Sequence, residues 1–150
     1  MADHFLVVIP RDPKADLPAS ANALRDALAT LAGTDEARVK DYGKLQFIDC
    51  GEAFESIACQ SCGEEVASDQ WHTWMDEDWH GEDGFHLHRH KAPCCQLETN
   101  LNALIYTPPQ GFARWFVSAR NKGRGPLDAD EVRALEKIAG VPLQAIVQRY

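Results

Sequence analysis

A β-strand is predicted by the stretch Phe112-Ala113-Arg114-Trp115-Phe116-Val117-Ser118-Ala119-Arg120. Residues alternate along this stretch. Arg114, Ser118 and Arg120 lie at even-numbered positions, and Trp115 and Val117 at odd-numbered ones, as expected for a strand with two different faces. The preceding Pro108-Pro109-Gln110-Gly111 is a strong turn signal. The second half of the fold therefore begins at residue 112.

A helix and a final strand follow. Asp128, with Glu131 three residues later, is an acidic variant of the capping box that begins a helix. The apolar face of this helix comprises Val132, Leu135, Ile138 and Ala139. Gly140 and Pro142 end it, as a C-cap glycine and a following helix breaker. Residues 143–150 then predict a strand, which gives the order β-α-β.

The first half of the chain predicts the same order. The apolar run His4-Phe5-Leu6-Val7-Val8-Ile9, ended by Pro10, indicates a largely buried strand. Residues 18–31 indicate an amphipathic helix that stops at Gly33. Its apolar positions, at helical spacing, are Leu17, Ala21, Leu24, Leu28 and Leu31. Residues 44–49 predict a second strand.

Two β-α-β halves separated by an insert predict an α+β fold, the ferredoxin-like β-α-β-β-α-β sandwich. We expect the helices to cover one face of an antiparallel sheet. The 150 residues suit a single domain, with a first half at 1–51, an insert at 52–111 and a second half at 112–150. Because so long a connection is uncommon without order of its own, we expect a zinc-ribbon-like insertion ordered by metal.

The net charge of −8 is concentrated in the insert. Residues 59–95 contain 8 acidic and 2 basic residues. Such a surface repels phosphate backbones, so we expect a protein partner of basic character rather than nucleic acid. The exception is a run of cations with no acid between them, Arg114, Arg120, Lys122 and Arg124. We interpret this run as a solvated strand end and loop, with an anion or acidic-partner site as the alternative.

Composition excludes several classes of protein. Apolar residues make up 45% of the chain and charged residues 25%, which excludes a fibrous or wholly disordered protein. No apolar run approaches the roughly 20 residues of a membrane span. The first residues carry Asp3 and only a short apolar run, unlike a secretion signal. We therefore expect a cytoplasmic protein with reduced cysteines and no membrane partner.

Four of the five cysteines form two close pairs. The first, Cys59-Gln60-Ser61-Cys62-Gly63, is a C-x-x-C-G knuckle, in which two thiolates can chelate one ion. The second, Cys94-Cys95, can reach the same ion if the chain turns at Pro93. Four sulfurs suit a structural zinc site. We predict one Zn²⁺ per chain, with the ligands Cys59, Cys62, Cys94 and Cys95.

Three alternatives stay open for these cysteines. In the first, His88 or His90 substitutes for one cysteine as a ligand. In the second, no metal is bound. The third is a redox dithiol, which Glu64 and Glu65 disfavour because neighbouring acids raise the pKa of a thiol. Cys50 has no partner at chelating spacing and is expected to be a small core residue.

The insert also contains five of the six histidines. They are His72, His80, His86, His88 and His90, and they lie among Trp71, Trp74 and Trp79. His86, His88 and His90 alternate, so on a strand they share one face and could hold a catalytic zinc with an open position. The alternatives are a solvated segment anchored by the tryptophans, or a single histidine that completes the cysteine site.

These motifs resemble those of a group of small bacterial proteins without an established activity. Their pattern combines C-P-x-C-G, P-C-C-G, L-N-x-L-x-Y-x-x-P-x-G-F-A-R-F and a final Arg-Asn-Pro-like turn. The matching residues are Cys59-Gln60-Ser61-Cys62-Gly63, Pro93-Cys94-Cys95, Leu101-Asn102-Ala103-Leu104-Ile105-Tyr106-Thr107-Pro108, Gly111-Phe112-Ala113-Arg114-Trp115 and Arg120-Asn121. The chain departs from the pattern at Gln60, Gln96 and Lys122-Gly123, where the group has proline, glycine and proline. The resemblance implies a shared metal site and no particular reaction.

Two functions follow from the sequence. The first is a non-catalytic zinc-binding protein with a structural four-cysteine site, which acts as a protein–protein interaction module, for example an immunity or antitoxin protein. The alternative is a zinc-dependent hydrolase or lyase that uses the histidine-rich insert. No P-loop, H-E-x-x-H, G-x-S-x-G or G-x-G-x-x-G motif is present in the sequence.

Overall fold

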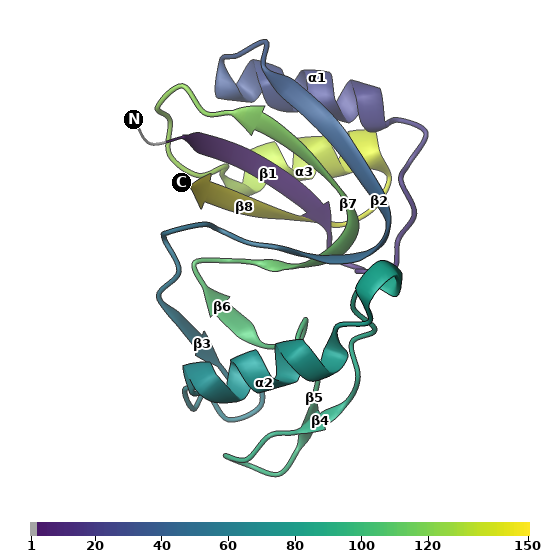
Figure 1. The fold of residues 1–150 in the computed structure, drawn as a ribbon. Helices are drawn as coiled ribbons and strands as arrows, with labels where there is room; N and C mark the ends of the chain where they lie inside the picture. The colour runs from purple at the N-terminus through teal and green to yellow at the C-terminus, as the bar shows by residue number, and fades with distance from the viewer. Residues whose placement is uncertain (1–2) are drawn as a thin grey trace.

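The computed structural model describes residues 3–150 and has an α+β fold (Figure 1). Its main sheet is antiparallel, with the strand order β2-β7-β1-β8. These strands are β1 (His4–Pro10), β2 (Ala37–Ile48), β7 (Gly111–Arg120) and β8 (Leu143–Arg149). Helices α1 (Ala21–Ala32) and α3 (Ala129–Ala139) pack on one face of this sheet. The predicted β-α-β order of both halves is confirmed.

The insert lies beyond one end of this sheet and consists of short elements (Figure 1). They are β3 (Ser56–Ala58), α2 (Ser68–Asp78), a 3-10 turn (Gly81–Asp83), β4 (His90–Lys91), β5 (Glu98–Thr99) and β6 (Ile105–Thr107). Strand β3 pairs with β6, and β4 pairs with β5, both antiparallel. The insert therefore has secondary structure of its own, although each of its strands is only two or three residues long.

The capping signals of α3 act as the sequence predicts. The carboxylate of Asp128 accepts a hydrogen bond from the Glu131 amide at 2.8 Å, and Glu131 Oε1 accepts one from the Asp128 amide at 3.0 Å. Gly140 ends the helix in the left-handed conformation. The capping box thus fixes the N-terminus of α3, and the glycine without a side chain fixes its C-terminus.

Strand β2 is longer than the predicted strand at 44–49. It begins at Ala37, and its register shifts between Asp41 and Gln46, where Gly43 has φ +69°. The first part of this edge strand is half-buried or exposed, so it lacks the apolar run that marks a buried strand. The sequence signal therefore covered only its buried end, around Leu45.

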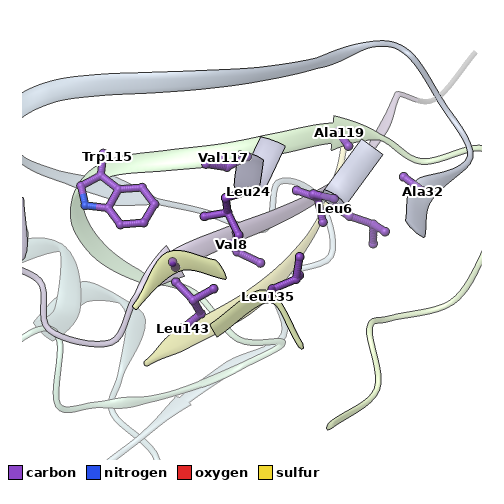
Figure 2. Close-up of a cluster of buried hydrophobic side chains, with 11 residues drawn as sticks. Leu6, Val8, Leu24, Ala32, Trp115, Val117, Ala119, Leu135 and Leu143 are labelled. Atoms are coloured by element: carbon purple, nitrogen blue, oxygen red, sulfur yellow. The ribbon is translucent and has the colours of Figure 1, made fainter. Parts of the chain in front are cut away.

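Apolar side chains fill the space between the sheet and its two helices (Figure 2). The buried members are Leu6, Val8, Leu24, Leu28, Ala32, Trp115, Val117, Ala119, Leu135, Ala139 and Leu143. Alternation along β1 sends Leu6 and Val8 into this core, and Val7 and Ile9 into a second cluster on the opposite face. Both faces of the central strands are therefore buried, which explains why β1 reads as a continuous apolar run.

A third cluster joins the insert to the end of the sheet. Leu45 of β2 and Phe112 of β7 pack in it against insert residues that include Trp74, Phe85 and Leu101. Phe85 and Phe112 form an edge-to-face pair with ring centroids 5.0 Å apart. The insert is therefore attached through a shared hydrophobic core. Across residues 3–150, no helix has both the length and the apolar character needed to cross a bilayer.

Candidate metal centre

The structure brings together all four cysteines of the two predicted pairs. Their Sγ atoms lie within 4.8 Å of one another. The Sγ atoms of Cys59 and Cys95 are 3.8 Å apart, and those of Cys62 and Cys94 are 3.3 Å apart. Two segments distant in the sequence thus place four sulfurs around one point.

The first pair lies on a tight turn that follows β3. The Cys59 amide donates to the Glu64 carbonyl at 2.8 Å, and the Gly63 amide donates to the Cys59 carbonyl at 2.9 Å. Gly63 has φ +78°, a conformation that favours glycine. Hydrogen bonds from the backbone amides of Cys62 and Ser61 lower the pKa of the Cys59 thiol to about 6. The turn therefore favours the thiolate, which is the form that binds metal.

The second pair lies at the tip of the β4–β5 hairpin. The Ala92 amide donates to the Leu97 carbonyl at 2.9 Å, and the Gln96 amide donates to the Ala92 carbonyl at 2.8 Å. Gln96 has φ +64°, so the chain reverses immediately after the two cysteines. This reversal allows the adjacent side chains of Cys94 and Cys95 to reach the same point. The sequence predicted that both cysteines can bind one ion only if the chain makes such a turn.

A side-chain hydrogen bond ties the two turns together. Thr99 of β5 donates from Oγ1 to Gln60 Oε1 at 2.8 Å, and Thr99 is buried. Gln60 lies between the first two cysteines, so its side chain links the first cysteine turn directly to the hairpin that carries the second.

The sulfur spacing is suited to one shared metal ion. Zinc–sulfur bonds of about 2.3 Å place neighbouring sulfurs about 3.8 Å apart, which matches the Cys59–Cys95 separation of 3.8 Å and exceeds the Cys62–Cys94 separation of 3.3 Å. Without a metal ion, the hydrogen bond with the Cys62 thiol raises the pKa of the Cys94 thiol to about 12. A divalent cation reverses this effect, since it stabilises each thiolate that binds it. Four thiolates suit zinc and also iron.

The remaining predicted residues lie elsewhere. Cys50 is fully buried in the cluster on the face of the sheet opposite α1 and α3, as expected of a core residue, and burial raises the pKa of its thiol. His88 belongs to a separate group of histidines. His90 stacks on Trp74 with ring centroids 4.8 Å apart. The two alternative ligands, His88 and His90, are therefore placed outside the four-sulfur cluster.

The histidine trio differs from the predicted one. His80, His86 and His88 offer nitrogen atoms within 4.8 Å of one another, and the buried Nε2 of His90 has no hydrogen-bond partner. The alternation of His86, His88 and His90 does not apply, because Leu87 has φ +57° and breaks the extended conformation. His80 was missed because it joins the others only through a tight reversal of the chain at 79–85.

The basic run pairs with acids of the same chain. Arg114 contacts Asp16 at 2.8 Å, Arg120 contacts Asp3 and Glu36, and Arg124 forms two hydrogen bonds with Glu131. Three of the four cations are thus neutralised within the fold. This arrangement supports the interpretation of a solvated strand end and loop rather than an anion site.

Comparison of the chain with family models, curated proteins and solved structures finds no match. The four-cysteine cluster and the histidine cluster must therefore be interpreted from their own chemistry.

Proposed function

We propose that the protein is a non-catalytic zinc-binding protein, in which one structural Zn²⁺ orders an insert that binds another protein. The observation that carries this proposal is the convergence of Cys59, Cys62, Cys94 and Cys95 from two separate turns. With four thiolates bound, a tetrahedral ion has no position left for substrate or water, which is typical of structural zinc. We expect this centre in a reducing compartment, where thiols persist.

The architecture supports a scaffold that presents the insert. The strand order β2-β7-β1-β8, with both helices on one face, supports assignment of the frame to the ferredoxin-like sandwich. Two facing cysteine turns, each next to a short antiparallel pair, support the description of the insert as zinc-ribbon-like. The two parts share a hydrophobic core, so we treat 1–150 as one domain.

A groove beside the metal centre supports a basic protein partner. The groove has a volume of about 580 Å³, and its lining includes Glu65, Asp69, Trp74, Pro93 and Cys94. The carboxylates favour a cationic side chain, and the acidic insert would steer such a partner toward the groove. Because Cys94 lines the groove, bound zinc would fix one of its walls. Neutralisation of a basic toxin is one form that this binding could take.

The metal half of the proposal is tested by native mass spectrometry of reduced protein before and after acid denaturation. In protein analysed as purified, without added zinc, we expect one zinc per chain in the wild type and none in Cys62→Ser. Cys50→Ser is the matched control and keeps its zinc, because Cys50 lies outside the cluster. A folded wild type without metal, or zinc retained by a Cys62→Ser, Cys94→Ser variant, would contradict the proposal.

The partner half is tested with Glu65→Lys and Asp69→Lys, which reverse charges in the groove and leave the cysteines unchanged. A basic protein that binds the wild type should associate more slowly with these variants, and more slowly at high salt. Association at the wild-type rate in both variants would place the partner elsewhere on the surface.

A further inference from the structure

We propose that His80, His86 and His88 form a second metal site, which binds a divalent transition ion such as Zn²⁺ through imidazole nitrogens. Each histidine offers one ring nitrogen, and these nitrogens lie within 4.8 Å of one another. The three side chains are exposed, so the ion would keep further coordination positions for water. The site shares no residue with the four-cysteine centre and goes beyond the structural function proposed for that centre.

The three rings form one compact group. The Nε2 atoms of His80 and His88 are 2.7 Å apart. The rings of His80 and His86 are stacked, with centroids 3.8 Å apart. The rings of His86 and His88 are 5.7 Å apart and inclined by 66°. To bind one ion, the stacked rings of His80 and His86 would have to rotate until their nitrogens face a common point, which their exposed side chains allow.

Without metal, the short contact between His80 and His88 fits a hydrogen bond between two neutral imidazoles. One ring donates its N–H and the other accepts, so both Nε2 atoms already face each other. Two nitrogens bound to one zinc at about 2.0–2.1 Å stand roughly 3.3 Å apart, so the rings would separate by a few tenths of an ångström. Exposed side chains can make this adjustment without repacking.

The backbone that carries the histidines is held by a buried acid. Asp78, the last residue of α2, is fully buried. Its carboxylate accepts hydrogen bonds from the amides of His86 at 3.0 Å, Leu87 at 2.8 Å and His88 at 2.5 Å. Leu87 has φ +57°, which is unfavourable for a leucine and is stabilised by these bonds. Asp78 therefore positions two of the three histidines.

The third histidine is brought close by the reversal at 79–85. The His80 amide donates to the Gly84 carbonyl at 2.9 Å, and Trp79 forms an isolated antiparallel β-bridge with Phe85. Gly84 has φ +73° and ψ −151°, a conformation open almost only to glycine. The reversal and the Asp78 hydrogen bonds together fix the relative placement of His80, His86 and His88.

The chemistry of the group selects the class of ligand. Neutral imidazoles suit zinc, copper and nickel, whereas calcium and magnesium prefer oxygen ligands. Glu82 and Asp83 lie in the turn between His80 and His86 and add negative charge beside the rings. The ligand is therefore a borderline transition-metal cation rather than a hard cation or an anion.

The test uses protein whose cysteine centre already holds one zinc. This protein is titrated with Zn²⁺ and followed by calorimetry and native mass spectrometry. We expect one further zinc per chain, with an affinity about 10-fold or more lower in His80→Ala and in His88→Ala. His72→Ala is the matched control, because His72 is exposed but bonds to the Ser68 carbonyl at 2.7 Å within α2. This variant should bind the second zinc as the wild type does.

Two results would overturn the site. One is a wild type that takes up no second zinc at excess metal. The other is a second zinc with wild-type affinity in a His80→Ala, His88→Ala variant. Imidazole NMR signals give a second readout that does not depend on variants, and zinc should shift those of His80, His86 and His88 but not that of His72. A Cys62→Ser variant that loses the first zinc and keeps the second would separate the two sites.

Discussion

Gly84 lies so close to the backbone of Leu45 that a Cβ atom on Gly84 would stand 2.3 Å from the Leu45 carbonyl oxygen. The next residue, Phe85, donates its amide to the same oxygen at 3.0 Å. A backbone contact of this kind fixes the 79–85 reversal of the insert against β2. The close approach is available only without a side chain, and it places the histidine cluster relative to the main sheet.

We therefore expect Gly84→Ala to destabilise the protein more than Gly81→Ala. Gly81 has φ +60°, so Gly81→Ala carries the left-handed penalty of roughly 1–2 kcal/mol. Gly84, at φ +73° and ψ −151°, lies in a region open almost only to glycine, where a side chain costs about 1–3 kcal/mol. Only Gly84→Ala adds a clash with backbone, because nothing lies within 4 Å of a Cβ atom at Gly81. Urea unfolding of the two variants measures the difference. Equal loss in both would mean that the insert is not fixed to β2 at this point.

Asp78→Asn tests the hydrogen bonds that hold the histidine loop. The substitution keeps the size of the side chain but leaves one acceptor oxygen for three backbone amides. Buried donors without partners cost about 1–3 kcal/mol, so the free energy of unfolding should fall by that order. Asp76→Asn, at an exposed position of the same helix, is the control and should change little. A wild-type urea midpoint for Asp78→Asn would show that these bonds contribute nothing.

Gln96→Gly tests the turn that carries the second cysteine pair. Gln96 has φ +64°, which costs an L-residue roughly 1–2 kcal/mol. Glycine removes this strain but loses about 0.5–1 kcal/mol through the greater freedom of the unfolded chain. We expect a gain in stability of up to about 1 kcal/mol, with zinc content unchanged. Gln96→Ala keeps the strain and should be less stable than Gln96→Gly in thermal unfolding; the reverse order would contradict the prediction.

The fold was predictable where local signals agree with burial. The apolar run of β1, the capping box at Asp128 and the terminal Gly140 each mark an element that the structure contains. The first part of β2 was not predictable, because its residues are largely exposed at the edge of the sheet. Its strand conformation depends on pairing with β7, a contact between distant segments that no local pattern encodes.

The two candidate sites also differ in how far a local sequence pattern predicts them. The cysteine pairs were recognisable because chelating spacing is a local property of the sequence. The histidine trio depends on Asp78, whose interaction with the backbone eight to ten residues later cannot be read from spacing. The useful signal would have been Gly81 and Gly84, two glycines that flank acidic residues and indicate a reversal between His80 and His86.

Metal removal should loosen the insert and spare the main sheet. The strands of the insert are two or three residues long, too short to be stable alone, so we expect a bound ion to supply much of their order. Chelation should increase hydrogen exchange in β3 to β6, while β1 and β7 stay protected by the separate helix–sheet core. Hydrogen-exchange mass spectrometry measures both regions in one experiment. Unchanged exchange in the insert after loss of metal would show that packing alone orders it.

The pH dependence of stability should contain a contribution from the ion pair between Glu131 and Arg124. Hydrogen bonds from Arg124, and then from the Asp128 amide, lower the pKa of Glu131 to about 2 from its ordinary 4.5. Because the folded state binds the proton less tightly than the unfolded state, the stabilisation is complete above pH 4.5 and is lost as the pH falls toward about 2.

Glu131→Gln removes the titrating group and keeps an oxygen that can accept from the Asp128 amide. The variant should be less stable than the wild type at neutral pH, and the gap should narrow as the pH falls through this range, since protonation abolishes the same interaction in the wild type. Asp130→Asn, in the exposed first turn of the same helix, controls for the loss of one negative charge, because the pair of Asp130 with Arg133 is solvent-exposed and contributes little. Urea unfolding at several acidic pH values measures the gap. A gap that stays constant down to about pH 2 would mean that the Arg124 pair does not set the acid sensitivity of α3.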